Sequence, residues 1–253
     1  MNPILMSFIV IVCTYCGTHL GLRIRKSLPE DHLSADTKEI VKLSAALIAT
    51  LTALVLGLLV SSAKDTLDTM TRELTQDGAK IILLDRTLAN YGPETSEIRT
   101  QLRGHVAYTL KLLWDEDIPG DAALKTAEDP RALESIQAKL RELSPHSDSQ
   151  RQLQTQALQL GIDLALSRWL IVESSQRLMP NAFLVVLSLW LMILFTCYGL
   201  IAPKNWTVRV VLFISALSIA GAIFLVLEMS TPLSGIIKVS SAPLQKALTF
   251  LGR

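Results

Sequence analysis

Long apolar stretches without Lys, Arg, Asp or Glu divide the chain. They cover residues 3–22, 43–63, 178–203 and 210–227. An α-helix rises about 1.5 Å per residue, so about 20 residues suffice to cross a bilayer core roughly 30 Å thick. The pattern therefore predicts four transmembrane helices.

The second apolar stretch continues into a polar helix without a break. No proline occurs between Lys64 and Asn90, and the following residues Tyr91-Gly92-Pro93 end the helix. Over this length apolar residues recur at heptad spacing: Leu67, Met70, Leu74, Ile81, Leu84 and Leu88. Such a seam packs against other helices. We therefore predict one helix that crosses the membrane and then projects into water.

Further helices are predicted before the third apolar stretch. They cover residues 94–114, 130–143 and 147–178. No segment shows the alternation of apolar and polar residues that is typical of a strand. The expected fold is all-α, with four transmembrane helices and a soluble helical bundle inserted between spans 2 and 3.

These elements divide the chain into four expected regions. Residues 1–63 hold spans 1 and 2 with their connector, and residues 64–178 form the soluble bundle. Residues 179–228 hold spans 3 and 4. Residues 229–253 form an apolar tail, which we expect to lie on the membrane or partly inside it.

The charges are distributed unevenly between these regions. Residues 62–178 contain 14 Lys and Arg against 18 Asp and Glu, whereas the rest of the chain contains 10 against 5. Because binding to phosphates needs clustered cations, the acidic bundle argues against a nucleic acid partner. The basic excess beside the spans fits contact with lipid headgroups.

One side of the second span carries small and hydroxyl side chains. Its members recur at spacings of three and four residues: Ala46, Thr50, Ala53, Gly57, Ser61 and Lys64. Such a stripe lets a neighbouring helix approach closely, because packing drives helix association in lipid. Alternatively it forms a pore wall. In that case the residues nearest the pathway are Thr50, Leu54, Gly57 and Ser61, with Lys64 at its mouth.

Candidate residues for other chemistry are few. Cys13, Cys16 and His19 follow one another at three-residue spacing, but they spread over about a third of the helix circumference. Acidic residues occur at positions 115–117, and Asp163 precedes Glu173, but neither set has the Glu-x-x-His pattern of di-metal bundles. No phosphate-binding loop or nucleophile motif is present. We therefore expect no enzymatic activity, no metal and no cofactor.

A single carboxylate lies at the end of the fourth span. Glu228 is costly at that depth unless it is paired or in contact with water. One interpretation is an interfacial carboxylate in water. The other is a buried carboxylate that binds an ion or stabilises the structure.

Several stretches resemble a bacterial family known as bestrophin-like. They are residues 84–93, residues 168–170, residues 195–205, and residues 221–232 with 240–244. The resemblance implies kinship with bestrophins, which are pentameric anion channels with four spans per subunit and a helical cytosolic part. Ser230 departs from the family pattern, which tends to carry an acidic residue at that position.

Two functions follow as hypotheses. The first is a homo-oligomeric channel, a pentamer if it follows the bestrophins, which conducts an inorganic anion along the second span. It would contact lipids as a multi-pass protein of the bacterial inner (plasma) membrane. The alternative is a non-conducting sensor or scaffold whose bundle binds a ligand or partner. The sequence does not decide on which side of the membrane the bundle lies. Basic residues in short connectors, such as Arg23, Arg25 and Lys26, favour the outside, whereas the resemblance favours the inside.

Overall fold

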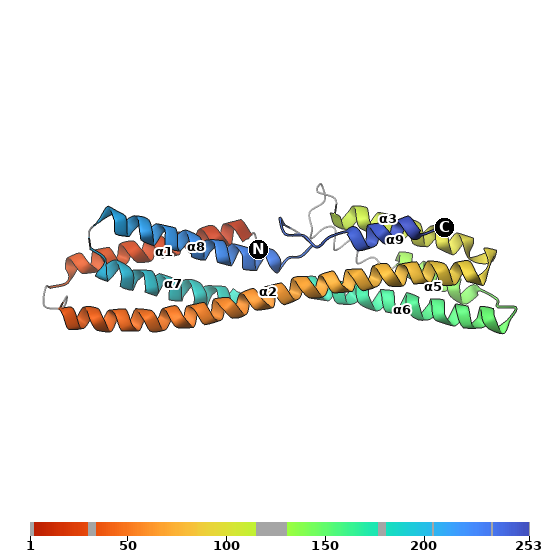
Figure 1. Cartoon of the computed structure of the whole chain (residues 1–253), viewed down its shortest axis with the longest axis horizontal. Helices are drawn as coiled ribbons and strands as arrows, with labels where there is room; N and C mark the ends of the chain where they lie inside the picture. Colours follow the sequence, from red (N-terminus) through yellow and green to blue (C-terminus); the bar gives the residue numbers. More distant parts are fainter. Residues whose placement is uncertain are drawn as a thin grey trace. The chain divides into compact units, whose positions relative to one another are not determined.

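The structure is a computed structural model that describes residues 3–29, 34–114, 131–176, 181–203, 205–233 and 235–252. These residues form helices and no strands (Figure 1), which confirms the all-α fold for the described part of the chain. The helices are α1 (Pro3–Ser27), α2 (Ala35–Tyr91), the short 3₁₀ helix η2 (Pro93–Thr95), α3 (Ser96–Trp114), α5 (Arg131–Glu142), α6 (Asp148–Gln176), α7 (Asn181–Ile201), α8 (Trp206–Met229) and α9 (Ala242–Phe250).

The prediction of four membrane spans is confirmed. Four helices, namely α1, α2, α7 and α8, are long and apolar enough to cross a membrane. The chain divides into two compact units, which are described separately below. Unit 1 contains Met1–Asp65 and Leu178–Ser230, and unit 2 contains Thr66–Arg177 and Thr231–Arg253.

Unit 1 is held together by the close approach of α1 and α7. A Cβ atom added at Gly21 would meet the carbonyl oxygen of Thr196, and one added at Gly199 would meet that of Thr18. Only glycine leaves room for this backbone contact, which is the usual role of small residues between membrane helices. Beside this contact lies an apolar cluster of Val10, Leu184, Leu187, Leu191, Ile223 and Leu227. At the basic end of α1, Arg25 donates to the carbonyl oxygen of Ala202.

Unit 2 has its own core, to which α2, α3, α5, α6 and the tail contribute. The predicted heptad seam of α2 is part of it, since Met70, Leu74, Ile81, Leu84 and Leu88 are all buried there. The seam therefore packs against other helices, as predicted, and in this chain they are helices of the same unit.

The tail differs from its predicted surroundings. Sequence analysis separated residues 64–178 from residues 229–253, whereas the structure groups Thr231–Arg253 with the second unit. Its apolar side chains belong to that unit's core: Leu233, Val239, Leu244, Ala247 and Leu251. Leu244, Ala247 and Leu251 share one helical face, because their spacings are three and four residues. Association of the tail with lipid stays a prediction.

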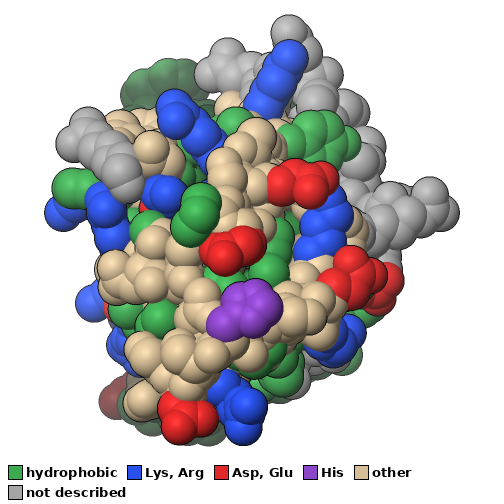
Figure 2. Space-filling model, turned by 90° about the vertical axis from the view of Figure 1, so that its right-hand side faces the viewer, with side chains coloured by type: hydrophobic (Ala, Val, Ile, Leu, Met, Phe, Trp, Pro, Cys, Tyr) green, Lys and Arg blue, Asp and Glu red, His purple; other side chains and the backbone are tan. Residues whose placement is uncertain are grey.

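The end of the molecule that Figure 2 presents mixes side chains of both charges. Lys and Arg lie among Asp, Glu and apolar side chains on this face, and neither sign forms a continuous patch. Nucleic acid binding would need a continuous basic surface. This face therefore offers no such surface, and the absence of a nucleic acid partner stays a prediction from the composition.

Candidate functional site

The candidate site is the outward face of the spanning part of α2. Its five predicted residues are Thr50, Leu54, Gly57, Ser61 and Lys64, and all five are exposed. The large apolar residue among them, Leu54, is 61% exposed. Their spacings of three and four residues place them on one side of the helix, so the structure brings the predicted set together on a single face.

The opposite face of the same span packs within unit 1. Ala45, Thr52 and Ala63 are buried, and Leu56 and Leu59 pack against the apolar cluster of that unit. The hydroxyl of Thr52 donates to the carbonyl oxygen of Ile48 at 2.7 Å, so this buried polar group is satisfied within the helix. One face of the span is therefore fixed by its own chain, and the face with the candidate residues is uncovered.

Gly57 is notable on the uncovered face because its own chain does not require it. A Cβ atom added there would meet nothing within 4 Å. Glycine in a helix interior is about 1 kcal/mol less favourable than alanine. Packing within the described chain therefore does not account for this glycine, just as it does not account for Gly104 or Gly221, where an added Cβ atom also meets nothing within 4 Å.

The polar groups of this face are two hydroxyls and one cation. The hydroxyl of Thr50 donates to the carbonyl oxygen of Ala46 at 2.9 Å, and Ser61 is exposed. Lys64, just beyond the apolar part, adds a positive charge at the end of the face. A cation at the mouth of a narrow pathway raises the local concentration of anions.

Glu228 lies apart from this face, near the end of α8. Its side chain is buried, with only 2% of the residue exposed. This burial favours the interpretation as a buried carboxylate over that of a carboxylate in water. A role in binding an ion stays a prediction.

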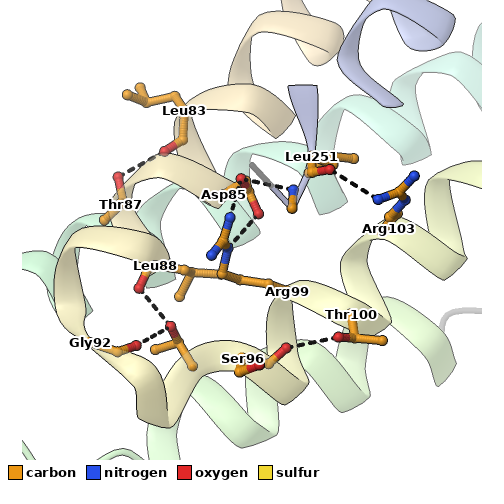
Figure 3. A network of polar contacts seen from close by, with 12 residues as sticks. Leu83, Asp85, Thr87, Leu88, Gly92, Ser96, Arg99, Thr100, Arg103 and Leu251 are labelled. Carbon is orange, nitrogen blue, oxygen red and sulfur yellow. Dashed lines mark hydrogen bonds and ion pairs between the residues drawn. The ribbon is translucent and has the colours of Figure 1, made fainter. Parts of the chain in front are cut away.

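A buried ion pair in unit 2 was not predicted from the sequence. Arg99 of α3 donates to both carboxylate oxygens of Asp85 in α2, at 2.8 and 3.0 Å (Figure 3). Asp85 is 1% exposed. The amide nitrogen of Gly252 also lies 3.4 Å from Asp85 Oδ2, and Arg103 donates to the carbonyl oxygen of Leu251 at 3.3 Å. This network joins α2, α3 and the tail.

The turn after α2 explains part of the sequence that resembles bestrophin-like proteins. Gly92 has φ 143°, a conformation that favours glycine. The hydroxyl of Thr95 donates to the carbonyl oxygens of Leu88 at 2.6 Å and Gly92 at 2.8 Å. Residues 84–93 therefore have a structural role, because they end α2 and supply Asp85.

A second polar group lies between α2 and α6. The pKa of Asp77 is raised, mainly because the carboxyl group is buried. The hydrogen bond with Ser167 and the charge of Lys80 oppose this shift. Burial also raises the pKa of Glu73, one turn earlier, and the neighbouring Asp77 raises it further. Lys80 Nζ lies 3.5 Å from Asp77 Oδ1 and donates to Ser167 Oγ at 3.1 Å. Among the described residues, Glu73 Oε2 is buried without a hydrogen-bond donor.

The contacts described for the other candidate residues do not indicate a metal site or a catalytic site. Cys13, Cys16 and Cys197 are free thiols. The described residues contain no group of three or more His, Cys, Asp and Glu that could hold a metal ion. Asp163 accepts a hydrogen bond from Gln159 at 2.9 Å. The acidic residues at 115–117 and the side chain of Glu173 lie outside the part of the chain that is described.

Four apolar spanning helices, with a second helical unit that continues from one of them, define a multi-pass membrane protein. The chain belongs to the Bestrophin-like family, because the model of the Bestrophin-like domain matches residues 12–244. No curated protein matches the chain.

Solved structures share the fold at low sequence identity. A mutant of a bacterial bestrophin homologue from Klebsiella pneumoniae is 14% identical, with a TM-score of 0.64 over 99% of this chain and 98% of that chain. The same kind of homologue, solved by Zn-SAD phasing, gives 14% and 0.64 over 98% and 96%. A structure described as a mutant membrane protein gives 15% and 0.63 over 99% and 97%. At these identities the likeness shows the fold alone.

Proposed function

We propose that the chain is one subunit of a homo-oligomeric ion channel in the bacterial inner membrane, and that anions pass along the outward face of α2. Thr50, Leu54, Gly57 and Ser61 line the pathway, and Lys64 lies at its mouth. The proposal requires assembly about an axis, since four helices of one subunit are too few to surround a pathway. Kinship with bestrophins, expected from membership of the family, supports both the anion and the assembly.

The observation that carries this proposal is the uncovered face of α2. Three of the five candidate residues on it, Thr50, Gly57 and Ser61, are small or hydroxylated, and all five are exposed. Leu47 and Leu58 of the same helix are also exposed, each at 63%, so the proposal rests on this small and hydroxylated stripe and not on the whole exposed surface of α2. A face with hydroxyls and a central glycine is better suited to water than to acyl chains.

The test is anion flux through the full chain in liposomes. Gly57→Trp adds a large ring to the uncovered face, and we expect it to lower chloride flux at least about tenfold. Leu217→Trp is the matched control, because Leu217 is 53% exposed on another span. Its flux should stay within about twofold of the unmodified protein.

Thiol labelling tests the pathway independently of conduction. Thr50→Cys and Ser61→Cys, in a chain whose three native cysteines are replaced by alanine, should react with a water-soluble thiol reagent. Protection at both positions, with labelling of a cysteine at Leu217, would show that another helix lines the pathway. An unmodified protein that is silent in liposomes would contradict the channel itself.

A different observation supports a second candidate, a non-conducting scaffold. Outside the spans, α6 exposes apolar side chains on one side: Ile162 49%, Leu166 59%, Trp169 55% and Leu170 50%. Exposed apolar patches of this kind mark surfaces that bind other proteins or lipids. Under this hypothesis, Leu166→Glu with Trp169→Glu would abolish partner binding and the protein would carry no flux. Under the channel hypothesis, flux is present in the unmodified protein.

A further inference from the structure

The tail is attached to unit 2 by a row of buried side chains. Val239, Leu244, Ala247 and Leu251 are each at most 5% exposed. Helix α9, which carries Leu244 and Ala247, lies beside α3 (Figure 1). The tail therefore fills part of the core between helices that belong to an earlier part of the chain.

Three polar contacts join the main chain of the tail to α2 and α3. Trp114 Nε1 donates to the carbonyl oxygen of Val239 at 2.8 Å, and Arg103 Nη1 donates to that of Leu251 at 3.3 Å. The amide of Gly252 donates to Asp85 at 3.4 Å (Figure 3). Bonds of 3.3 and 3.4 Å are longer than the usual 2.9–3.0 Å, so the end of the tail is held weakly.

Removing the tail would leave no buried charge without a partner. Asp85 keeps two short bonds from Arg99 whether or not Gly252 is in place. Arg103 is exposed and can turn to water. The nine residues of α9 are too few to hold a helix by themselves, because isolated helices shorter than about 12–15 residues are marginal in water. The tail is thus ordered by docking and can leave as a unit.

A single glycine lets the tail lie close to α2. A Cβ atom added at Gly78 would lie 2.9 Å from the carbonyl oxygen of Pro243 and 3.2 Å from its carbon. Both atoms are backbone, so the contact cannot be relieved by turning a side chain. Glycine is otherwise unfavourable inside α2, and its place there is explained by the tail.

We propose that residues 239–252 form a releasable strap, which joins the chain after α8 to α2 and α3 and can detach while the other helices of unit 2 remain folded. Its contact points are the backbone of Pro243 on Gly78, the carbonyl of Val239 on Trp114, and the buried face of α9. Detachment opens one side of that unit's core. The inference does not depend on ion conduction.

The test uses the full chain in detergent and a change that acts on the strap without weakening α2. Gly78→Ala favours the helix but places a methyl group against the backbone of Pro243. Hydrogen exchange of the amides of Gln245 and Leu251, which are bonded within the tail, should accelerate at least about tenfold. Exchange in α7 should stay unchanged. Gly104→Ala on α3 is the matched control, since nothing lies within 4 Å of a Cβ atom there, and it should leave the tail unchanged.

A small local shift of the backbone could accommodate the methyl group of Gly78→Ala, so a larger side chain at the same position provides a second test. Gly78→Leu should release the strap completely, so that the tail amides exchange at the rate of an unstructured peptide while those around Leu160 and Leu164 in α6 remain protected. Two results would overturn the proposal. One is tail exchange in Gly78→Leu that equals the unmodified protein. The other is a parallel rise in the tail and in α6, which would mean that the tail is an inseparable part of the unit.

Discussion

The guanidinium of Arg99 makes a bidentate contact with the carboxylate of Asp85, with Nε 2.8 Å from Oδ1 and Nη2 3.0 Å from Oδ2. The two residues lie on successive helices and on either side of the Gly92 turn, and Asp85 is almost fully buried. The pairing raises the pKa of Arg99, because the hydrogen bonds to Asp85 stabilise its charged form. This contact holds α3 against α2 after the turn.

Breaking that pair should be strongly destabilising. Asp85→Ala leaves the guanidinium of Arg99 without its partner, and we expect the free energy of unfolding to fall by about 3–5 kcal/mol. Arg99→Lys should also destabilise, since an ammonium cannot make the two parallel bonds. Denaturant unfolding in detergent measures both. Lys139→Ala is the control, because it breaks only the exposed pair with Glu97 and should cost less than about 1 kcal/mol. Equal losses for Asp85→Ala and Lys139→Ala would contradict this account.

The carboxylates between α2 and α6 should make stability depend on pH. The pKa values of Glu73 and Asp77 are raised in the folded protein, first by burial. The folded state therefore binds more protons than the unfolded state between the ordinary and the raised pKa values. The contribution of these groups to stability is present below their ordinary pKa values of 4.5 and 3.8, and it is lost as pH rises through the raised ones.

The measurement is the midpoint of thermal unfolding, followed from pH 4 upward. The variant Glu73→Gln with Asp77→Asn keeps the shape of both side chains but removes their titration. It should lose less stability than the unmodified protein as pH rises. Identical pH profiles for the two proteins would show that these carboxyl groups are not perturbed. Lys80 and Ser167, the other polar groups that contact Asp77, are left in place.

The contact between α1 and α7 should not tolerate a methyl group. Gly21→Ala forces the backbones of Gly21 and Thr196 apart, and overpacking of this kind typically costs about 1–3 kcal/mol. Gly221→Ala in α8 is the matched control, because a Cβ atom there meets nothing within 4 Å. Thermal unfolding in detergent compares the two. A Gly21→Ala protein as stable as Gly221→Ala would show that the helices are not packed as described.

Self-association should be visible as mass. We expect native mass spectrometry of the protein in nanodiscs to give a homo-oligomer, with five subunits if it follows the bestrophins. The expectation rests on the uncovered face of α2. A protein that stays monomeric in nanodiscs would remove the channel hypothesis as well.

The spans and most helix ends could be predicted from local sequence. Uncharged stretches of sufficient length have few alternatives to a transmembrane helix, and glycine with proline at positions 92 and 93 marks the end of α2. The predicted bounds differ mainly where charges adjoin a span. Helix α1 continues through Arg23, Arg25 and Lys26 to Ser27, and α2 begins at Ala35, before the uncharged stretch that starts at Leu43. Charged residues at a helix end reach water, so they do not stop the helix.

Contacts between distant parts of the chain could not be predicted in this way. Asp85 and Arg99 are both ordinary surface residues by type, and only the path of the turn brings them together. Gly57 and Gly78 both interrupt a leucine-rich helix, yet one faces open space and the other the backbone of Pro243. For the candidate site, helical periodicity predicts which residues share a face. What covers that face depends on other copies of the chain, about which local sequence says nothing.

The docking of the tail also sets an order of events during synthesis. Helix α6 ends at Gln176, but Leu251, which completes the core around it, is made about 75 residues later. At roughly 5–20 residues per second, the ribosome needs about 4–15 s for that interval. Two transmembrane helices must be inserted during the same time. Until translation has nearly ended, the core of the second unit lacks the apolar side chains of the tail, and the side chains that the tail would cover stay exposed. We expect the nascent protein to be sensitive to aggregation and proteolysis during this interval.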